Sequence, residues 1–360
     1  MTKQNVRRRY SLRNAVAVLF IAVLLLTAAA PLFARGAAET EPTTVVATHS
    51  IIGDLVANVA GDTIELQVLV GPDQDPHVYE PAPADSITLR NAVLVFENGL
   101  QLKSWFDGLY ERSGSTARRV VLGEQLHHLL PWGGHGHDHG HSHDDHGHGH
   151  SHDDHDHHED AHHNDHHGHD DHHADDHHHD HGDYDPHIWQ SVHNAEDMVK
   201  VIRDTLIEVF PEHADTFRAN AAAYIEELEA LDDYIKEQVA RIPEQRRKLV
   251  TSHGAFDYYT DRYGFTVVGT ALGSVTTEGR DPSAGEIAAL VDEIRALDIP
   301  AIFAETIVNR AVVDTIAREA GVQVLYPLYS DALGAPGTPG ETYIGMMRHN
   351  TDLIVDGLAD

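Results

Sequence analysis

The chain of 360 residues contains no cysteine, and this absence excludes several kinds of site at once. Without a thiol there is no disulfide, no Fe–S cluster, no cysteine-based zinc site and no cysteine that carries a lipid behind a secretion signal. Any metal site in this protein must therefore use imidazole and carboxylate ligands.

Basic residues are also scarce. The 25 Lys and Arg are outnumbered by 58 Asp and Glu, which gives a formal net charge of −33. A field of this sign repels nucleic acid and attracts cations. We therefore expect a cation, and no nucleic acid, among the partners of the protein.

Long apolar runs are limited to one, near the N-terminus. Residues 15–34 read AVAVLFIAVLLLTAAAPLFA and follow a basic head. This pattern is typical of a secretion signal, so we assign residues 1–38 to a signal peptide, with cleavage between Ala34 and Ala38. An uncleaved anchor is the alternative, because about 20 apolar residues can span a bilayer. Since no second run follows, we expect a soluble periplasmic protein.

Histidine is abundant, and most of it lies in one tract from His135 to His181. The tract holds 23 histidines and 14 acidic residues, and alanine is its only apolar residue type. Such a segment cannot bury enough surface to fold, so we expect a disordered insertion. Flexible ligands lose entropy when they converge on an ion, so its metal sites should be weak and numerous. The tract would gather, buffer or sense metal for a tight site elsewhere.

Strand-like apolar runs alternate with amphipathic helices on both sides of the tract. Before it, TTVVATH, IELQVLVG and AVLVFEN are typical of buried strands, and after it RKLVTSH, AIFAET and VQVLYPL are similar. The alternation predicts an α/β fold with mainly parallel sheets flanked by helices. We predict an N-terminal lobe over residues 39–190 and a C-terminal lobe over residues 244–360.

A helical connection over residues 191–243 separates the two predicted lobes. It includes one long helix, from about residue 213 to 241, with no Gly or Pro in its interior. Apolar residues such as Leu228 and Leu231 recur on one stripe, and Pro243 ends the pattern. We interpret this helix as a rigid connecting helix that contacts both lobes.

Four residues are candidate metal ligands, and each is predicted at the carboxyl end of a strand. In this fold class that edge is where ligands bind. Three imidazoles and one carboxylate form a closed N₃O set that suits zinc, and catalytic zinc keeps a position open, so we expect no enzyme activity. The candidates are His77 in GPDQDPHVYEP, His187 in DYDPHIWQS, His253 in LVTSHGAF and Asp331 in YPLYSDALG.

The motif Asp-Pro-His occurs twice, at His77 and at His187. Proline gives a rigid turn, so the imidazole of the histidine that follows it has a fixed direction. Asp75 and Asp185, two residues earlier, are placed to accept the far imidazole N–H and so to fix the tautomer. Glu305 in IFAET ends a strand and is expected to support a ligand in the same way.

Two alternatives stay open at these positions. Asp331 lies in a turn, where Asp needs no metal to be favoured. If it were not a ligand, the open coordination position would favour a secreted zinc metallohydrolase. His49 ends the first predicted strand and is a weaker candidate for the site, although Ser50 beside it is an equally good helix cap.

A set of motifs runs through the chain: IIGDLVANVAGD, GPDQDPHVYEPAPAD, DPHIW, TSHGAFDYY, DPSAGEIAALVDEIR, IFAE and YPLYSDALG. Taken together, these motifs resemble the solute-binding proteins of ABC transporters that form the zinc/manganese-binding cluster, and most of all its zinc-uptake members. The resemblance covers nearly all of the mature sequence. It implies two lobes, a rigid connecting helix and delivery of the metal to an ABC permease for import. It also implies that His77, His187, His253 and Asp331 hold the metal between the lobes. We expect a monomer.

Zn²⁺ is the expected ion, and Mn²⁺ is the alternative. Manganese-preferring members of this family tend to carry Glu in the TSxGAF block, where this chain has His253. Imidazole in place of a hard oxygen moves the preference toward zinc. The histidine-rich insertion also resembles zinc members. The chain departs from the family in one respect. Relatives in single-membrane bacteria usually carry a lipid-attached cysteine, and this chain has no cysteine. Its absence suggests that a periplasmic space retains the protein.

Overall fold

The computed structural model describes residues 44–102, 105–132, 184–272 and 282–359, which all belong to one unit, Thr44–Asp360. The predicted signal peptide, 1–38, and the predicted insertion, 135–181, lie outside the described residues. None of the helices in the described ranges has both the length and the apolar composition that a membrane span requires.

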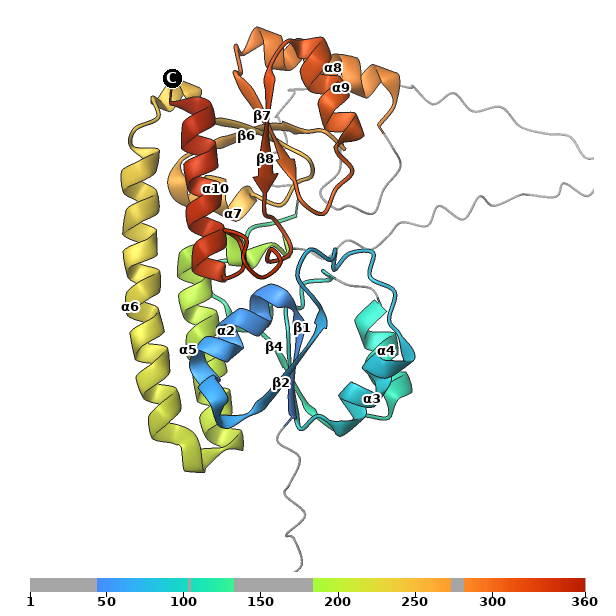
Figure 1. The fold of residues 1–360 in the computed structure, drawn as a ribbon, viewed down its shortest axis with the longest axis vertical. Coiled ribbons are helices and arrows are strands. Elements are labelled where there is room, and N and C mark those ends of the chain that lie inside the picture. Colours follow the sequence, from blue (N-terminus) through green and yellow to red (C-terminus); the bar gives the residue numbers. More distant parts are fainter. Residues whose placement is uncertain (1–43, 103–104, 133–183, 273–281, 360) are drawn as a thin grey trace, which may run out of the picture. The chain divides into compact units, whose positions relative to one another are not determined.

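The N-terminal lobe is built on a four-stranded parallel sheet in the order β2-β1-β3-β4 (Figure 1). Its side chains alternate between two cores, as the pleat of a strand requires. Val45 and Ala47 pack with helix α2, whereas Val46 packs with α3 and α4 on the other face. Both faces are covered, which explains the continuous apolar runs of these strands. The elements are β1 (Thr44–His49), α2 (Ser50–Ala60), β2 (Glu65–Val70), α3 (Pro83–Asn91), β3 (Leu94–Glu97), α4 (Trp105–Ser113) and β4 (Arg118–Val121).

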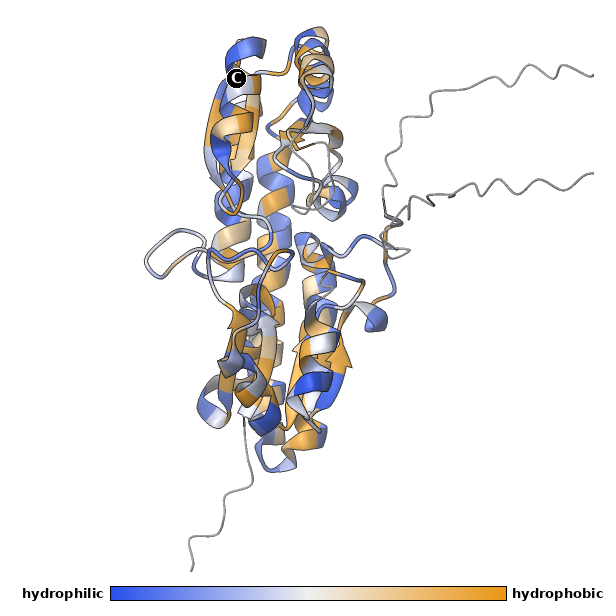
Figure 2. Cartoon of the chain, turned by 90° about the vertical axis from the view of Figure 1, so that its right-hand side faces the viewer, coloured by the Kyte–Doolittle hydropathy of each residue, from blue (hydrophilic) through white to orange (hydrophobic). Residues whose placement is uncertain are grey.

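The C-terminal lobe contains two parallel strand pairs, β5 with β6 and β7 with β8, and β5 lies beside β7. Here too the strands alternate: Phe303 packs in the same core as α10, and Ile302 packs against α8 and α9. Figure 2 shows that the strands are mostly apolar, while the helices carry hydrophilic and apolar stripes. The elements are β5 (Lys248–Thr251), α7 (Asp257–Tyr263), β6 (Thr266–Thr270), α8 (Ala284–Ala296), β7 (Ala301–Glu305), α9 (Arg310–Ala320), β8 (Gln323–Leu328) and α10 (Tyr343–Leu358).

Two long helices, α5 (Val192–Val209) and α6 (Ala214–Val239), connect the lobes. The 26 residues of α6 correspond to about 39 Å of helix. Helix α6 packs against α2 and α5 and also against α7 and α10, so it contacts elements of both lobes. Short 3₁₀ helices lie at Gly61–Thr63 (η1), Gly123–Gln125 (η2), Ile188–Gln190 (η3), Pro211–His213 (η4) and Glu244–Arg246 (η5).

The predicted architecture is confirmed: an α/β fold with two lobes, parallel sheets flanked by helices, and one long connecting helix. That helix was predicted from about residue 213 to 241 and is observed at Ala214–Val239. The domain boundaries near residues 190 and 243 stay predictions.

Asp232 fixes the connecting helix α6 to the C-terminal lobe. Its carboxylate accepts hydrogen bonds from Arg262 Nε at 2.6 Å and Nη2 at 2.7 Å, and from the Tyr263 hydroxyl at 2.8 Å. Lys236 Nζ lies 2.6 Å away. Burial raises the pKa of Asp232, but the hydrogen bonds from Arg262, Lys236 and Tyr263 outweigh it and lower the pKa to about 2.

Asp232→Asn is therefore expected to lower the free energy of unfolding by about 2 kcal/mol at neutral pH. The pKa of an unfolded Asp is about 3.9, so the ionised carboxylate stabilises the fold fully above that pH. This contribution disappears as the pH falls toward about 2, and the variant should show a weaker pH dependence in that window. Urea unfolding at a series of pH values measures both effects.

The control is Asp233→Asn, one residue further along α6. Its carboxylate is 84% exposed and lies 3.7 Å from Lys236 Nζ, so the change should stay within about 0.5 kcal/mol. Equal stability of the two variants would show that the contacts of Asp232 do not stabilise the fold.

Candidate metal centre

The four predicted ligands come together in the structure. One donor atom each from His77, His187, His253 and Asp331 can be chosen so that all four lie within 4.8 Å of one another. The Nε2 atoms of His77 and His253 lie 3.1 and 3.0 Å from Asp331 Oδ2. His187 Nε2 lies 3.4 Å from His77 Nε2 and 3.7 Å from Asp331 Oδ1. Within the described ranges, no other group of three or more such residues has this geometry.

The donor set fits a four-coordinate ion. Zinc bonds of 2.0–2.2 Å in a tetrahedron place neighbouring donors about 3.3–3.6 Å apart. The four contacts given above measure 3.0–3.7 Å, and one donor atom from each residue lies within 4.8 Å of the others. His187, His253 and Asp331 are fully buried and His77 is 4% exposed. Neither carboxylate oxygen of Asp331 accepts a well-aligned hydrogen bond from the described residues. Buried oxygens without such donors are suited to a cation.

Strand ends position three of the four side chains. His253 follows β5 by two residues, Asp331 follows β8 by three, and His77 lies in the loop after β2. His187 differs from the prediction, because the residues just before it do not form one of the sheet strands. It directly precedes η3, after an isolated antiparallel bridge between Pro131 and Tyr184.

Asp185 orients the imidazole of His187. Its Oδ1 lies 2.7 Å from His187 Nδ1 and also accepts the backbone N–H of His187 at 2.9 Å. With Nδ1 protonated toward Asp185, Nε2 keeps its lone pair for a metal ion, as predicted. Asp75 makes the same backbone contact in the first Asp-Pro-His motif, where its Oδ1 accepts the backbone N–H of His77 at 2.8 Å.

Glu305 supports His253 from the side away from the other ligands. Its Oε2 lies 2.5 Å from His253 Nδ1, and its Oε1 accepts the backbone N–H groups of Ser252 and His253 at 2.8 and 2.9 Å. The Glu305 backbone N–H donates in turn to Ser252 Oγ at 3.1 Å. The end of β7 thus holds the loop that follows β5, in agreement with the supporting role predicted for Glu305.

Charge in the centre is balanced between imidazoles and carboxylates. Burial lowers the pKa of His253, but the charges of Glu305 and Asp331 outweigh it and raise that pKa well above its ordinary value. Burial raises the pKa of Asp331, and the neighbouring His253 and His187 hold it well below its usual range instead. A divalent ion that binds here therefore competes with a proton for the imidazole of His253.

His49 caps helix α2 in place of Ser50, so the expectation that Ser50 makes an equally good cap is wrong. His49 has extended backbone angles and its Nδ1 accepts the Ile52 backbone N–H at 3.4 Å. Ser50 is already the first helical residue, and its Oγ accepts the backbone N–H of Leu333 at 3.0 Å. Ser50 thereby holds the loop that follows Asp331.

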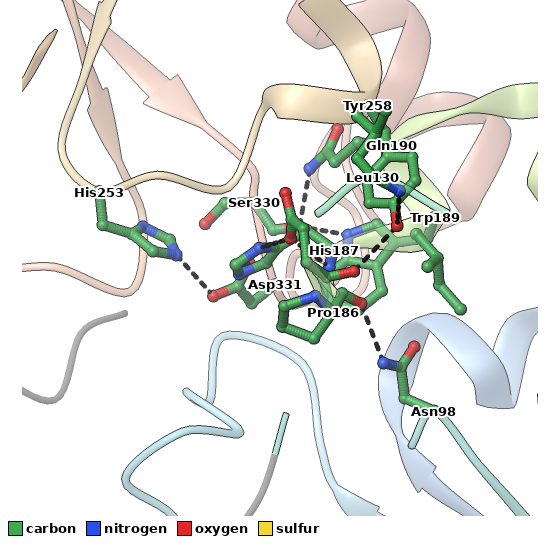
Figure 3. A network of polar contacts seen from close by, with 12 residues as sticks. Asn98, Leu130, Pro186, His187, Trp189, Gln190, His253, Tyr258, Ser330 and Asp331 are labelled. Atoms are coloured by element: carbon green, nitrogen blue, oxygen red, sulfur yellow. Dashed lines mark hydrogen bonds and ion pairs between the residues drawn. The ribbon is translucent and has the colours of Figure 1, made fainter. Parts of the chain in front are cut away.

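Other supporting residues were not predicted from the sequence (Figure 3). Trp189 Nε1 and Gln190 Nε2 both donate to the carbonyl of Ser330, at 2.8 and 3.1 Å. They connect the segment that carries His187 to the one that carries Asp331. Trp189 lies two positions after the second Asp-Pro-His motif, but no local pattern in the sequence indicates its hydrogen bond to Ser330.

The family described as "Zinc-uptake complex component A periplasmic" matches residues 45–357. The chain belongs to this family. Its members include metal-binding solute-binding proteins of ABC transporters, which confirms the resemblance stated from the sequence motifs.

Relatives in this family are named for different metals. The manganese-binding lipoprotein MntA of Halalkalibacterium halodurans is 32% identical over 315 residues, which cover 88% of each chain. The iron ABC transporter substrate-binding lipoprotein MtsA of Streptococcus pyogenes serotype M1 is 28% identical over 348 residues, 94% of this chain and 96% of the relative. The solved structure of the periplasmic zinc binding protein TroA from Treponema pallidum has a TM-score of 0.70 and 28% identity, and covers 88% of this chain and 99% of that one. Family membership therefore leaves the choice of ion open.

Proposed function

We propose that this protein is a periplasmic receptor that binds Zn²⁺ at His77, His187, His253 and Asp331 and delivers it to an ABC permease for import. The observation that carries the proposal is the convergence of four buried donor atoms, three of them imidazole nitrogens, within 4.8 Å. An N₃O set of this kind suits zinc better than it suits manganese, which prefers carboxylate, carbonyl and water oxygens.

Complete burial of the donors supports a role as a carrier. His77 and His187 belong to the predicted N-terminal lobe, residues 39–190, and His253 and Asp331 belong to the predicted C-terminal lobe, residues 244–360. An ion enclosed by both lobes leaves only when their loops separate. Such a site retains its cargo in solution and requires a conformational step for release, which suits delivery to a membrane partner.

The alternative of a secreted zinc hydrolase is less well supported. A catalytic zinc ion needs a coordination position for water, and four protein ligands fill a tetrahedral shell. Asp331 is the residue that decides between the two functions, and both of its carboxylate oxygens are buried among the imidazoles.

Growth of a deletion strain tests the choice of metal. Cells that lack this protein should stop growing in chelator-treated medium, and added Zn²⁺, but not Mn²⁺, should restore growth. The same cells that carry the wild-type protein should grow at the lower free zinc concentration. Rescue by Mn²⁺ alone would overturn the assignment of zinc and support manganese. Recovery of the protein in an osmotic-shock fraction would test the periplasmic location.

A further inference from the structure

Tyr258 connects three segments of the chain beside the metal centre. Its side chain, from helix α7, is buried. Its hydroxyl accepts the backbone N–H of Leu130 at 3.1 Å and donates to the carbonyl of Asp185 at 2.9 Å (Figure 3). The backbone N–H of Asp185 donates to the carbonyl of Leu130 at 2.9 Å. These three hydrogen bonds form a closed ring.

This ring fixes the two chain segments from which residues 133–183 extend. Pro131 and Tyr184 form an antiparallel bridge next to it. One member of the ring, Asp185, also holds His187 through both its backbone N–H and its Nδ1 atom. Because a sheet strand does not directly position His187, its place depends on such loop contacts. The hydroxyl of Tyr258 is one such contact, made by helix α7 of the C-terminal lobe to the carbonyl of Asp185.

We propose that Tyr258 is a positioning residue for metal binding, which acts through Asp185 on the imidazole of His187. This inference rests on the proposed metal-binding function. Loss of the hydroxyl leaves the Leu130 N–H and the Asp185 carbonyl without this partner. The turn at Asp185 then becomes less rigid, and the imidazole of His187 is held less firmly in the orientation that binds the metal. Tyr258 needs no contact with the ion to have this effect.

Tyr258→Phe tests the proposal, because it removes the hydroxyl and keeps the ring. The probe is Zn²⁺ alone, supplied below one equivalent against a competing chromogenic chelator, so that only the tightest site fills. Groups that hold a ligand directly change metal affinity by about 10–100-fold, so we expect a loss of about three- to tenfold for this more distant residue. The visible spectrum of bound Co²⁺ should change as well, because it reports the geometry of the ligands.

Tyr259→Phe is the matched control. Tyr259 is the next residue of α7, is equally buried, and shares a hydrogen bond of 3.1 Å with Thr351 Oγ1 on α10, away from the ligands. This variant should lose stability to a similar degree and keep the wild-type affinity and Co²⁺ spectrum. An equal loss of affinity in both variants would assign the effect to general stability and overturn the inference.

Double variants test the route through His187. If Tyr258 acts on that ring, Tyr258→Phe should weaken binding no further in a His187→Ala background and should keep its effect in a His77→Ala background. Equal effects in both backgrounds would overturn the inference. Failure of the wild-type protein to bind Zn²⁺ tightly would overturn the proposed function, whereas wild-type affinity in Tyr258→Phe would overturn only the role of Tyr258.

Discussion

Replacing His253 with alanine is expected to weaken Zn²⁺ binding at least a hundredfold while the fold is retained. The change removes one of three nitrogen donors and leaves Asp331 Oδ2 without the imidazole that lies 3.0 Å from it. Since loss of a group that only supports a ligand costs about 10–100-fold in affinity, loss of the ligand itself should cost more. Competition with a chelator measures the affinity, and circular dichroism verifies the fold.

The control for this variant is His193→Ala. His193 lies on α5, its side chain is 50% exposed, and its Nδ1 lies 3.6 Å from Glu196. Removal of this imidazole changes the histidine count equally and should leave affinity unchanged. A His253→Ala protein that bound Zn²⁺ as tightly as the His193→Ala protein would show that His253 is not a ligand.

Tryptophan fluorescence offers a second measurement on the same proteins. Of the three tryptophans in the chain, Trp132 stacks on the His187 ring with centroids 6.4 Å apart, and Trp189 meets its edge at 5.6 Å. An ion that binds beside His187 should alter their emission. The emission change should saturate at one equivalent in the wild-type protein and be shifted to higher Zn²⁺ concentration in His253→Ala.

The fold could be predicted from local sequence because its elements carry strong periodic signals. Strands buried on both faces read as continuous apolar runs, and β1 (Thr44–His49) lies within the predicted TTVVATH. The connecting helix has one apolar stripe, no interior Gly or Pro, and Pro243 beyond its end. Its observed bounds differ from the predicted ones by one or two residues, which is the usual uncertainty at a helix end.

The donors of the candidate site and the carboxylates beside them, Asp185 and Glu305, could be predicted, but the more distant residues that hold their loops could not. Imidazoles after Asp-Pro turns and strand ends are visible in the sequence. By contrast, the hydroxyl of Tyr258 bonds to Asp185 across 73 positions, and Ser50 bonds to Leu333 across 283. Such pairs depend on how the lobes pack, for which a single sequence has no local pattern. The choice of His49 over Ser50 as the cap of α2 has the same origin.

Glu305→Gln is expected to weaken Zn²⁺ binding by about 10–100-fold, although it alters no ligand. A histidine that binds metal through Nε2 must carry its proton on Nδ1, which needs an acceptor there. If the new amide points its NH₂ group at His253 Nδ1, the proton moves to Nε2 and blocks the metal. If the amide flips, its NH₂ group faces the backbone N–H groups of Ser252 and His253. These two donors then lose the acceptor that Glu305 provides in the wild-type protein at 2.8 and 2.9 Å. Chelator competition measures the loss.

Glu97→Gln is the matched control, because Glu97 ends β3 as Glu305 ends β7, and both are buried. The Glu97 carboxylate accepts a hydrogen bond from Arg119 Nε at 2.8 Å and is not among the four clustered candidate ligands. Glu97→Gln removes one buried negative charge, as Glu305→Gln does. If the lost charge alone weakened Zn²⁺ binding, the affinity should fall in both variants. A specific loss in Glu305→Gln would show that the carboxylate acts by fixing the tautomer of His253, and equal losses would contradict that mechanism.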